Sequence, residues 1–230
     1  VSAVRKGHPA LLIVDTVSGL GAAEFDMDGW NVDVAVAGSQ KAFMAPPGLA
    51  FIAANARAMA VAEKCTNRKF YFDLLKYRQL LEKGQTPFTP AISTIYAVEE
   101  ALAYFEKVGV DAIVAEHYKR RDIVRAGLRA MGLKLIAADE IASPAVTAVE
   151  CPKGVDPNVL RKLLLDKFNI IIAGGQGKFA STTFRVGHLG AVRILDLFAV
   201  MVGLEMALKH LGAEIIPGKA IGAMEELLMK

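Results

Sequence analysis

The sequence predicts an α/β fold followed by a small second domain of mixed α+β type. Short apolar runs at residues 10–14 and 48–53 have the length and composition of buried strands. Apolar residues at helical spacing follow between residues 55 and 131, and short strands alternate with helices from residue 132 onward. Because 53% of the 230 residues are apolar, the chain can bury a sizeable core.

The first part of the chain alternates strands with loops. The run Ala10 to Val14 ends in Asp15, so this strand brings a carboxylate to its C-terminal end. Near-continuous apolar strands of this kind are typical of parallel sheets whose faces are both covered by helices. We therefore expect part of a mainly parallel sheet, with helices, in the first domain.

Four helices are expected after these strands. Their predicted ranges are 55–65, 70–83, 93–108 and 111–131. The helix over 93–108 is amphipathic, and its spacing predicts that Ile95, Leu102 and Phe105 are buried. The basic run Lys119-Arg120-Arg121 is interpreted as a solvated helix face.

The remaining chain predicts a compact α+β unit. Strands are expected over 133–137, 145–150, 170–173 and 182–186, and helices over 156–168, 191–211 and from 219 to the end. We place the domain boundary after residue 107, which gives a first domain over 1–107 and a small α+β domain over 108–230.

Bulk composition argues against several classes of protein. A net charge of +3, from 27 basic and 24 acidic residues, is near balance, and no motif indicates nucleic-acid binding. No apolar run approaches the roughly 18 residues of a membrane helix. Two cysteines, Cys65 and Cys151, are too few for a disulfide framework and lack metal-ligand spacing. We expect a cytoplasmic protein without a metal site.

Lys41 is the first candidate for chemistry. It lies in a loop between strands, among small residues and before Pro46-Pro47. An amine in apolar surroundings is poorly solvated as a cation and becomes a nucleophile able to form a Schiff base, as in pyridoxal phosphate sites. Such a site also needs an aspartate for the pyridinium nitrogen, and Asp15 ends a strand where α/β sheets place ligands. Taken singly, Lys41 also fits a solvated surface charge, and Asp15 a structural turn residue.

Together these segments resemble the class V aminotransferases of the alanine–glyoxylate, serine–glyoxylate and serine–pyruvate group. The resemblance is carried by Val14-Asp15-Thr16-Val17-Ser18, Met27-Asp28-Gly29-Trp30, Gly38-Ser39-Gln40-Lys41-Ala42, Pro46-Pro47-Gly48-Leu49-Ala50-Phe51 and Thr183-Phe184-Arg185-Val186-Gly187-His188-Leu189-Gly190. It implies the fold type I architecture of pyridoxal phosphate enzymes. Residues 1–107 would be the C-terminal part of the cofactor-binding large domain and 108–230 the small domain, normally in a homodimer.

The resemblance also implies a role for each matching residue. Lys41 would bind pyridoxal phosphate, Asp15 would pair with its ring nitrogen, and Val17 would pack on the ring. Gln40 would contact the phosphate, and Thr89 would reach the phosphate of a neighbouring subunit. In the second domain, Arg185 would bind the substrate carboxylate through its planar fork, whereas His188 is interpreted as structural.

The implied reaction moves an amino group from alanine or serine to glyoxylate or pyruvate, with Lys41 as the catalytic base and acid. Two alternatives stay open. A cysteine desulfurase-like lyase is disfavoured, because Gln40 rather than histidine precedes Lys41 and Cys151 ends a strand. The other alternative is a non-catalytic fragment or assembly subunit, since relatives carry a long N-terminal portion with the main phosphate-binding loop. We expect a separate N-terminal segment to supply that loop.

Overall fold

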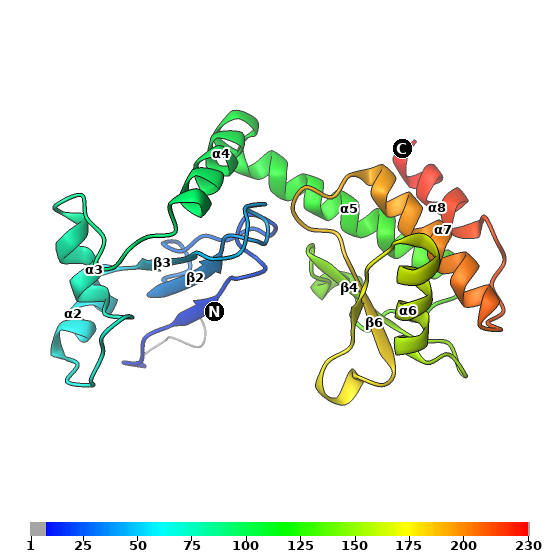
Figure 1. The fold of residues 1–230 in the computed structure, drawn as a ribbon, viewed down its shortest axis with the longest axis horizontal. Coiled ribbons are helices and arrows are strands. Elements are labelled where there is room, and N and C mark those ends of the chain that lie inside the picture. Colours follow the sequence, from blue (N-terminus) through cyan, green and yellow to red (C-terminus); the bar gives the residue numbers. More distant parts are fainter. Residues whose placement is uncertain (1–7, 230) are drawn as a thin grey trace. The chain divides into compact units, whose positions relative to one another are not determined.

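The structure is a computed structural model that describes residues 8–229. The chain forms two compact units (Figure 1). Unit 1 contains the described residues up to Leu20 together with Glu24–Lys107, and unit 2 contains Gly21–Ala23 and the chain from Val108 onward. The main division therefore falls after Lys107, the position at which the sequence analysis places its domain boundary.

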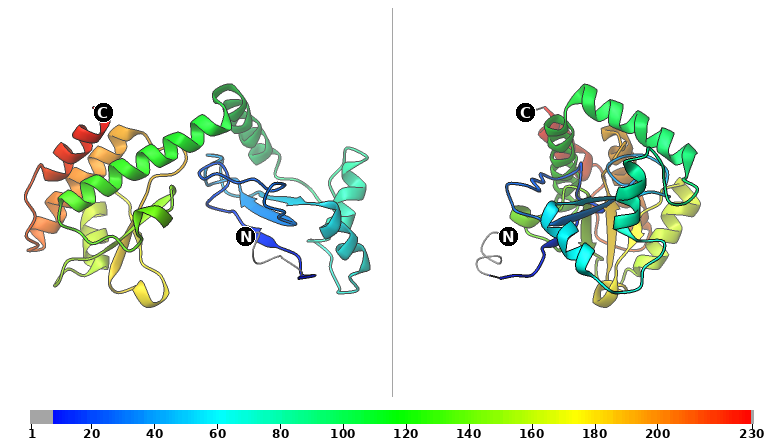
Figure 2. Two further views of the ribbon diagram at one scale, coloured as in Figure 1. Left: turned by 180° about the vertical axis from the view of Figure 1, so that it is seen from behind. Right: turned by 90° about the vertical axis from the view of Figure 1, so that its left-hand side faces the viewer.

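Unit 1 is built on a sheet of three strands within the described residues. The strands are β1 (Ile13–Asp15), β2 (Val34–Gly38) and β3 (Ala50–Ala54), in the order β1-β2-β3. β1 is parallel to β2, and β2 is antiparallel to β3 (Figure 2). The sheet is less parallel than the sequence analysis predicts, because the 39–49 loop turns the chain directly back into β3 without a crossover helix.

Three helices belong to unit 1, namely α2 (Ala56–Lys64), α3 (Leu74–Leu81) and α4 (Ile92–Val108, whose last residue is assigned to unit 2). The N-cap residues of α2 and α3 are Asn55 and Asp73, whose side chains accept hydrogen bonds from backbone amides of the first turn. These caps explain why each helix starts where it does.

The buried face of α4 differs in part from the predicted one. Phe105 is buried and stacks on Phe43, with ring centroids 5.4 Å apart. Ile95 and Leu102, however, are 41% and 44% exposed, and Val98 lies in the core instead. The prediction was wrong for Ile95 and Leu102, because the stripe that meets the rest of unit 1 is narrower than the apolar face of the helix.

A buried carboxylate joins the elements of unit 1. Asp33, directly before β2, is fully buried. It accepts hydrogen bonds from the Leu12 amide (2.7 Å) and from Asn55 Nδ2 (3.0 Å), and it forms an ion pair with Arg57 Nη1 (3.0 Å). The segment before β1, the end of β3 and the first turn of α2 thus meet at one residue. We refer to Asp33 with these three partners as the Asp33 hub.

Unit 2 combines a second sheet with four helices. Its elements are α5 (Val110–Ala130), β4 (Val146–Glu150), α6 (Pro157–Phe168), β5 (Ala173–Gly174), β6 (Thr183–Gly187), α7 (Ile194–His210) and α8 (Lys219–Leu228), with 3-10 turns at Asp139–Ile141 and Gly177–Phe179. The antiparallel strands lie in the order β4-β6-β5. Helices and sheet share one apolar core, in which Phe184 of β6 and Leu204 of α7 are fully buried.

Two strands predicted for unit 2 are wrong in extent. Over 133–137 only Leu135 forms a bridge, to Val149, although neighbouring backbone groups bond to β4. The strand expected over 170–173 begins only at Ala173. Asn169 there adopts a left-handed conformation that ends α6, and the Ile170 amide still bonds back into that helix.

The basic run on α5 is not a solvated face. Arg120 is buried, and the guanidinium of Arg121 lies 4.6 Å from the Tyr118 ring centroid. Only Lys119 of the three is exposed. The interpretation from sequence was wrong because burial of an arginine is decided by partners distant in the chain, which a local charge run does not reveal.

Replacing Asp33 by asparagine should destabilise unit 1. Asparagine would lose the ion pair with Arg57. Its amide nitrogen is a donor and would face the donors that now bond to the Asp33 carboxylate. We expect the free energy of unfolding to fall by about 2–4 kcal/mol, measured by urea denaturation. The exposed Asp28→Asn is the matched control, and equal effects of the two variants would show that the hub does not stabilise the unit.

Candidate functional site

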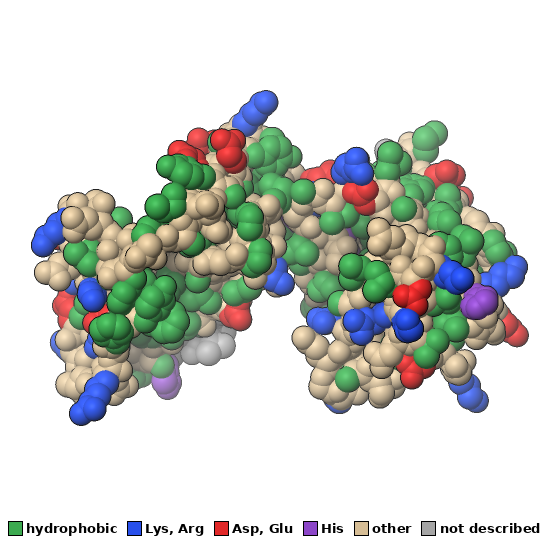
Figure 3. All heavy atoms as spheres, viewed as in Figure 1, with side chains coloured by type: hydrophobic (Ala, Val, Ile, Leu, Met, Phe, Trp, Pro, Cys, Tyr) green, Lys and Arg blue, Asp and Glu red, His purple; other side chains and the backbone are tan. Residues whose placement is uncertain are grey.

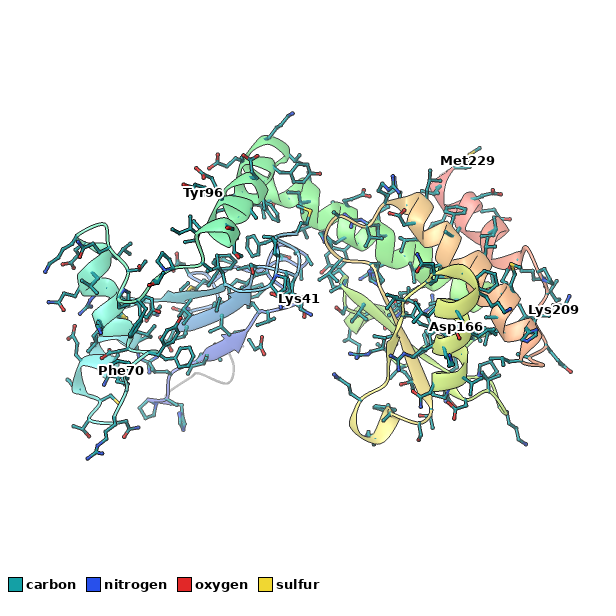
Figure 4. The ribbon with its side chains drawn as sticks, viewed as in Figure 1. Lys41, Phe70, Tyr96, Asp166, Lys209 and Met229 are labelled. Atoms are coloured by element: carbon teal, nitrogen blue, oxygen red, sulfur yellow. The ribbon has the colours of Figure 1, made fainter. Side chains whose placement is uncertain are left out.

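The parallel strands of unit 1 bring two short segments to one edge of the sheet. β1 ends at Asp15 and β2 at Gly38, and Asp15 lies beside Val36 in the register. The loops that leave these strands carry Val17, Gln40 and Lys41; Figure 4 labels Lys41 at this end of the sheet. We call residues 15–17 with 38–41 the carboxyl edge. Ligands of α/β sheets bind at such an edge.

One oxygen of the Asp15 carboxylate is held by a hydrogen bond from the protein. Its Oδ1 accepts a hydrogen bond from the Val17 amide (2.9 Å), and its side chain is exposed. Within residues 8–229 its Oδ2 has no hydrogen-bond partner. The buried Thr16 fixes this turn, because both its amide and its hydroxyl donate to the Val36 carbonyl (2.9 and 2.7 Å). The carboxylate therefore keeps an acceptor for a ligand.

Ser39 fixes the loop that carries Lys41. Ser39 is fully buried, its hydroxyl donates to the Pro46 carbonyl (2.7 Å), and it accepts from the Leu49 amide (3.3 Å). Its own amide donates to the Leu49 carbonyl (3.1 Å). The side chain of Lys41 is half-buried and makes no hydrogen bond or ion pair within the described part of the chain. The Lys41 amine thus lies on a loop whose two ends are joined through Ser39.

Gly38 lets the two loops approach each other. A Cβ at this buried position would lie 3.0 Å from Gln40 Oε1 and 3.7 Å from Val17 Cγ1. The space that a side chain would fill is therefore left to Val17 and Gln40, which come from different strands. Both of these predicted cofactor-binding residues therefore lie next to Gly38.

Thr89 does not join the carboxyl edge through any contact among residues 8–229. It is exposed in the loop between α3 and α4. Beside it, Phe88 packs on Tyr71 and Phe70, and Lys76 Nζ lies 4.7 Å from the Phe88 ring centroid. Figure 3 shows hydrophobic side chains gathered in this part of unit 1, where Figure 4 labels Phe70.

Arg185 belongs to unit 2, at the centre of β6. Its neighbours across the sheet are the small residues Ala148 on β4 and Ala173 on β5. Nε donates to the Gly174 carbonyl (2.7 Å), whereas Nη1 and Nη2 have no hydrogen-bond partner in residues 8–229. The side chain is half-buried. One edge of the guanidinium is therefore fixed by the protein and the terminal fork stays available.

Thr16, Ser39 and Asp33 lie in or beside the matching motifs, but the sequence assigned no role to any of them. Each acts through backbone groups 7 to 21 residues away in the chain. Periodicity carries no signal for such bonds; the only local indication for Ser39 is its place two residues before Lys41. The structural interpretation of His188 agrees with its position, since it is fully buried and its Nε2 lies 2.9 Å from Thr147 Oγ1.

A family model, aminotransferase class-V, matches residues 1–194. The chain belongs to this family. The serine–glyoxylate aminotransferase of Methylorubrum extorquens is 35% identical, covering 99% of this chain and 60% of its own length. A protein named soluble hydrogenase, small subunit, from Synechococcus sp. is 41% identical and covers 98% of this chain. This chain thus spans about 59% of the length of the curated relatives that it matches.

Solved structures confirm the predicted fold type I architecture. The pyridoxamine–pyruvate aminotransferase of Mesorhizobium loti superposes with a TM-score of 0.93 at 30% identity, covering 99% of this chain and 59% of the other. The ureidoglycine–glyoxylate aminotransferase of Bacillus subtilis gives 0.88 at 32% identity, covering 96% and 58%. Within the described residues, no helix combines the length and apolar character needed to span a membrane.

Ser39→Ala should loosen the loop that carries Lys41. The Pro46 carbonyl and the Leu49 amide would each lose the partner that the buried Ser39 supplies, at a cost of about 0.5–1.5 kcal/mol for each bond. We expect faster hydrogen–deuterium exchange over residues 39–49, measured by mass spectrometry, with the rest of unit 1 unchanged. The exposed Ser93→Ala serves as control. Unaltered exchange in the loop would mean that Ser39 does not hold it.

Proposed function

We propose that the chain is part of a pyridoxal phosphate-dependent aminotransferase that moves an amino group from alanine or serine to glyoxylate or pyruvate. The observation that carries the proposal is the pairing of β1 with β2, which places the Asp15 carboxylate and the Lys41 loop at one edge in a chain of this family. The names of relatives, among them serine–glyoxylate aminotransferases, support this substrate class.

The residues at the carboxyl edge fit pyridoxal phosphate in chemistry. Among residues 8–229, Asp15 keeps a carboxylate oxygen without a partner for a protonated ring nitrogen, and Lys41 keeps an amine without a partner for the aldehyde. Val17 supplies an apolar side chain for the ring, and the Gln40 amide a donor for the phosphate. When bound, the cofactor supplies an electron sink that stabilises negative charge at the substrate Cα.

The protein's own groups would then position the substrate and move its protons. Lys41 Nζ would take the proton from the substrate Cα and later return one, acting as base and then as acid. Arg185 would bind the α-carboxylate through two parallel hydrogen bonds from its terminal fork. Because Nε is already bonded to the Gly174 carbonyl, the plane of the guanidinium is set before substrate arrives.

Thr89 is proposed to serve a second copy of the chain in a homodimer, where it would contact the phosphate of the neighbouring site. The support is the exposed apolar surface near it: Phe70 and Phe72 are 74% and 82% exposed. Such aromatic groups are characteristic of protein interfaces. Sedimentation of the purified chain tests this assembly, and a strictly monomeric protein would contradict it.

A non-catalytic role is the second candidate. It is favoured by two relatives named soluble hydrogenase subunits, 41% and 40% identical. β1 is an edge strand and its Ile13 is 63% exposed, so a further polypeptide segment has a surface to pair with. A lyase resembling cysteine desulfurases stays disfavoured, since those structures share the fold at 14% identity and Gln40 precedes Lys41.

Titration with pyridoxal phosphate followed by borohydride reduction should label Lys41. Peptide mapping by mass spectrometry is expected to find the cofactor on the peptide that contains Lys41, and Lys41→Ala should abolish the label. Lys178→Ala, in unit 2, is the control. A label on another lysine would refute the assignment.

The same titration tests the separate-segment proposal. If the chain binds no cofactor alone but binds it after the N-terminal part of a relative is added, that proposal is supported. Absence of binding in both cases favours the non-catalytic role.

Arg185→Lys should weaken amino-acid binding without loss of cofactor. Lysine keeps the charge but cannot form two parallel bonds, and losing a charge-assisted bond costs about 1.5–3 kcal/mol. We expect the Kd of L-alanine for the cofactor-loaded protein to rise by about one to two orders of magnitude. Arg161→Lys is a matched control, because Arg161 Nε also donates to a backbone carbonyl of unit 2. Loss of cofactor with unchanged L-alanine binding would refute the role.

A further inference from the structure

The segment that follows β6 is held by two buried side chains of α5. The Gly190 amide donates to His117 Nε2 (3.0 Å), and Arg120 Nη1 donates to the Gly190 carbonyl (2.6 Å). His117 and Arg120 are both buried. Because both backbone groups of one residue are bonded to side chains of one helix, the position of the chain at Gly190 is fixed relative to α5.

His188, two residues earlier, ties the same segment to the start of β4. Its amide donates to the Ala145 carbonyl (3.0 Å). Its ring nitrogens Nδ1 and Nε2 lie 3.0 Å from the Pro144 carbonyl and 2.9 Å from Thr147 Oγ1. We call His117, Arg120, Thr147, His188 and Gly190 the β6 clamp.

The hydrogen-bond partners require His117 to be neutral. Nδ1 of His117 lies 2.7 Å from the Ile113 carbonyl, which only accepts, so Nδ1 carries the proton and Nε2 is free to accept from the Gly190 amide. His188 also has a carbonyl at Nδ1 but a hydroxyl at Nε2, so its contacts alone do not fix its charge. A hydroxyl can turn and accept, but an amide cannot. Protonation of His117 would therefore place two donors against each other.

The surroundings favour these neutral forms. Burial lowers the pKa of His117, and burial lowers that of His188 from 6.5 to about 4. The charge of Arg120 also lowers the pKa of both histidines, and Arg121 lowers that of His188. Glu116 raises the pKa of His117. The stability contributed by neutral His188 is complete above its ordinary pKa of 6.5 and is lost as pH falls toward 4; the lowered pKa of His117 acts in the same direction.

The clamp fixes the register that places Arg185. Phe184 and Val186 are buried on either side of it, so a slip of one residue is excluded. A slip of two residues would keep the same faces but would put Thr182 in the place of Phe184 or His188 in the place of Val186. It would also break every contact made by His188 and Gly190. The clamp thus selects Arg185 as the residue between Ala148 and Ala173.

We propose that His117 is a positioning residue for Arg185, whose neutral imidazole, together with Arg120, holds the backbone after β6 and so fixes where the guanidinium lies. The proposal deepens, and rests on, the carboxylate-binding function proposed for Arg185. It extends the substrate site to side chains that do not contact the substrate. It also makes the position of Arg185 sensitive to acid through one imidazole.

Nuclear magnetic resonance of the full chain tests the clamp without any ligand. With 15N in glycine and histidine, His117 should show the tautomer protonated at Nδ1, and the Gly190 amide resonance should titrate together with the His117 ring as pH is lowered from 7.5 to 4.5. A tautomer protonated at Nε2, or a Gly190 amide that does not follow His117, would overturn the proposal.

Two substitutions separate positioning from general stability. His117→Gln places an amide oxygen near the position of Nε2 and cannot titrate in this range, whereas His117→Phe removes the acceptor. Exchange of the Arg185 Nε proton, which bonds to Gly174, should become about fivefold to tenfold faster in His117→Phe and stay close to wild type in His117→Gln. If His117→Phe does not fold, the pH titration of the wild type supplies the same comparison.

The ligand measurement distinguishes this proposal from the function of Arg185. If the exchange results hold but the cofactor-loaded wild type does not bind L-alanine, the clamp stands and the carboxylate-binding function fails. If L-alanine binds equally to wild type, His117→Phe and His117→Gln, and Arg185 exchange is unchanged, the positioning role is refuted. A rise in Kd confined to His117→Phe supports it.

Discussion

The candidate site depends on the parallel pairing of β1 with β2. Two parallel neighbours end at the same edge, so a carboxylate that closes one strand and a loop that leaves the other must meet there. The antiparallel return through β3 contributes in another way, because it closes the 39–49 loop on itself through Ser39. Strand direction thus decides which side chains share the edge, and the loop decides how firmly Lys41 is held.

Buried polar groups play the same part in both units. In unit 1 the Asp33 hub ties strand ends to α2, and in unit 2 the β6 clamp ties a strand end to α5. In each case a group that is costly to bury is bonded to partners from distant parts of the chain. Apolar packing sets which face of a strand is inside, whereas the polar bonds of the β6 clamp are proposed to set the register of β6 and so the position of Arg185.

The two units carry different residues of the proposed chemistry. Unit 1 carries the residues proposed for the cofactor, and unit 2 carries the guanidinium proposed for the substrate carboxylate. Each group is prepared within its own unit: Asp15 by the Val17 amide and Arg185 by the Gly174 carbonyl. Relatives of this chain include named aminotransferases and named hydrogenase subunits, so the family fold alone does not decide the activity.

The sequence by itself determined the fold class, most of the helices and the motifs around Asp15, Lys41 and Arg185, because apolar periodicity and short motifs are local properties. Only the tertiary structure decided that β3 runs antiparallel, that Ile95 and Leu102 face outward, and that Arg120 is buried against the chain after β6. The β2–β3 pairing and the burial of Arg120 depend on groups brought together from 12 to 70 residues apart, and such long-range partners leave no periodic signal. For the same reason the hydrogen bonds that prepare Lys41 and Arg185 became visible only in the fold.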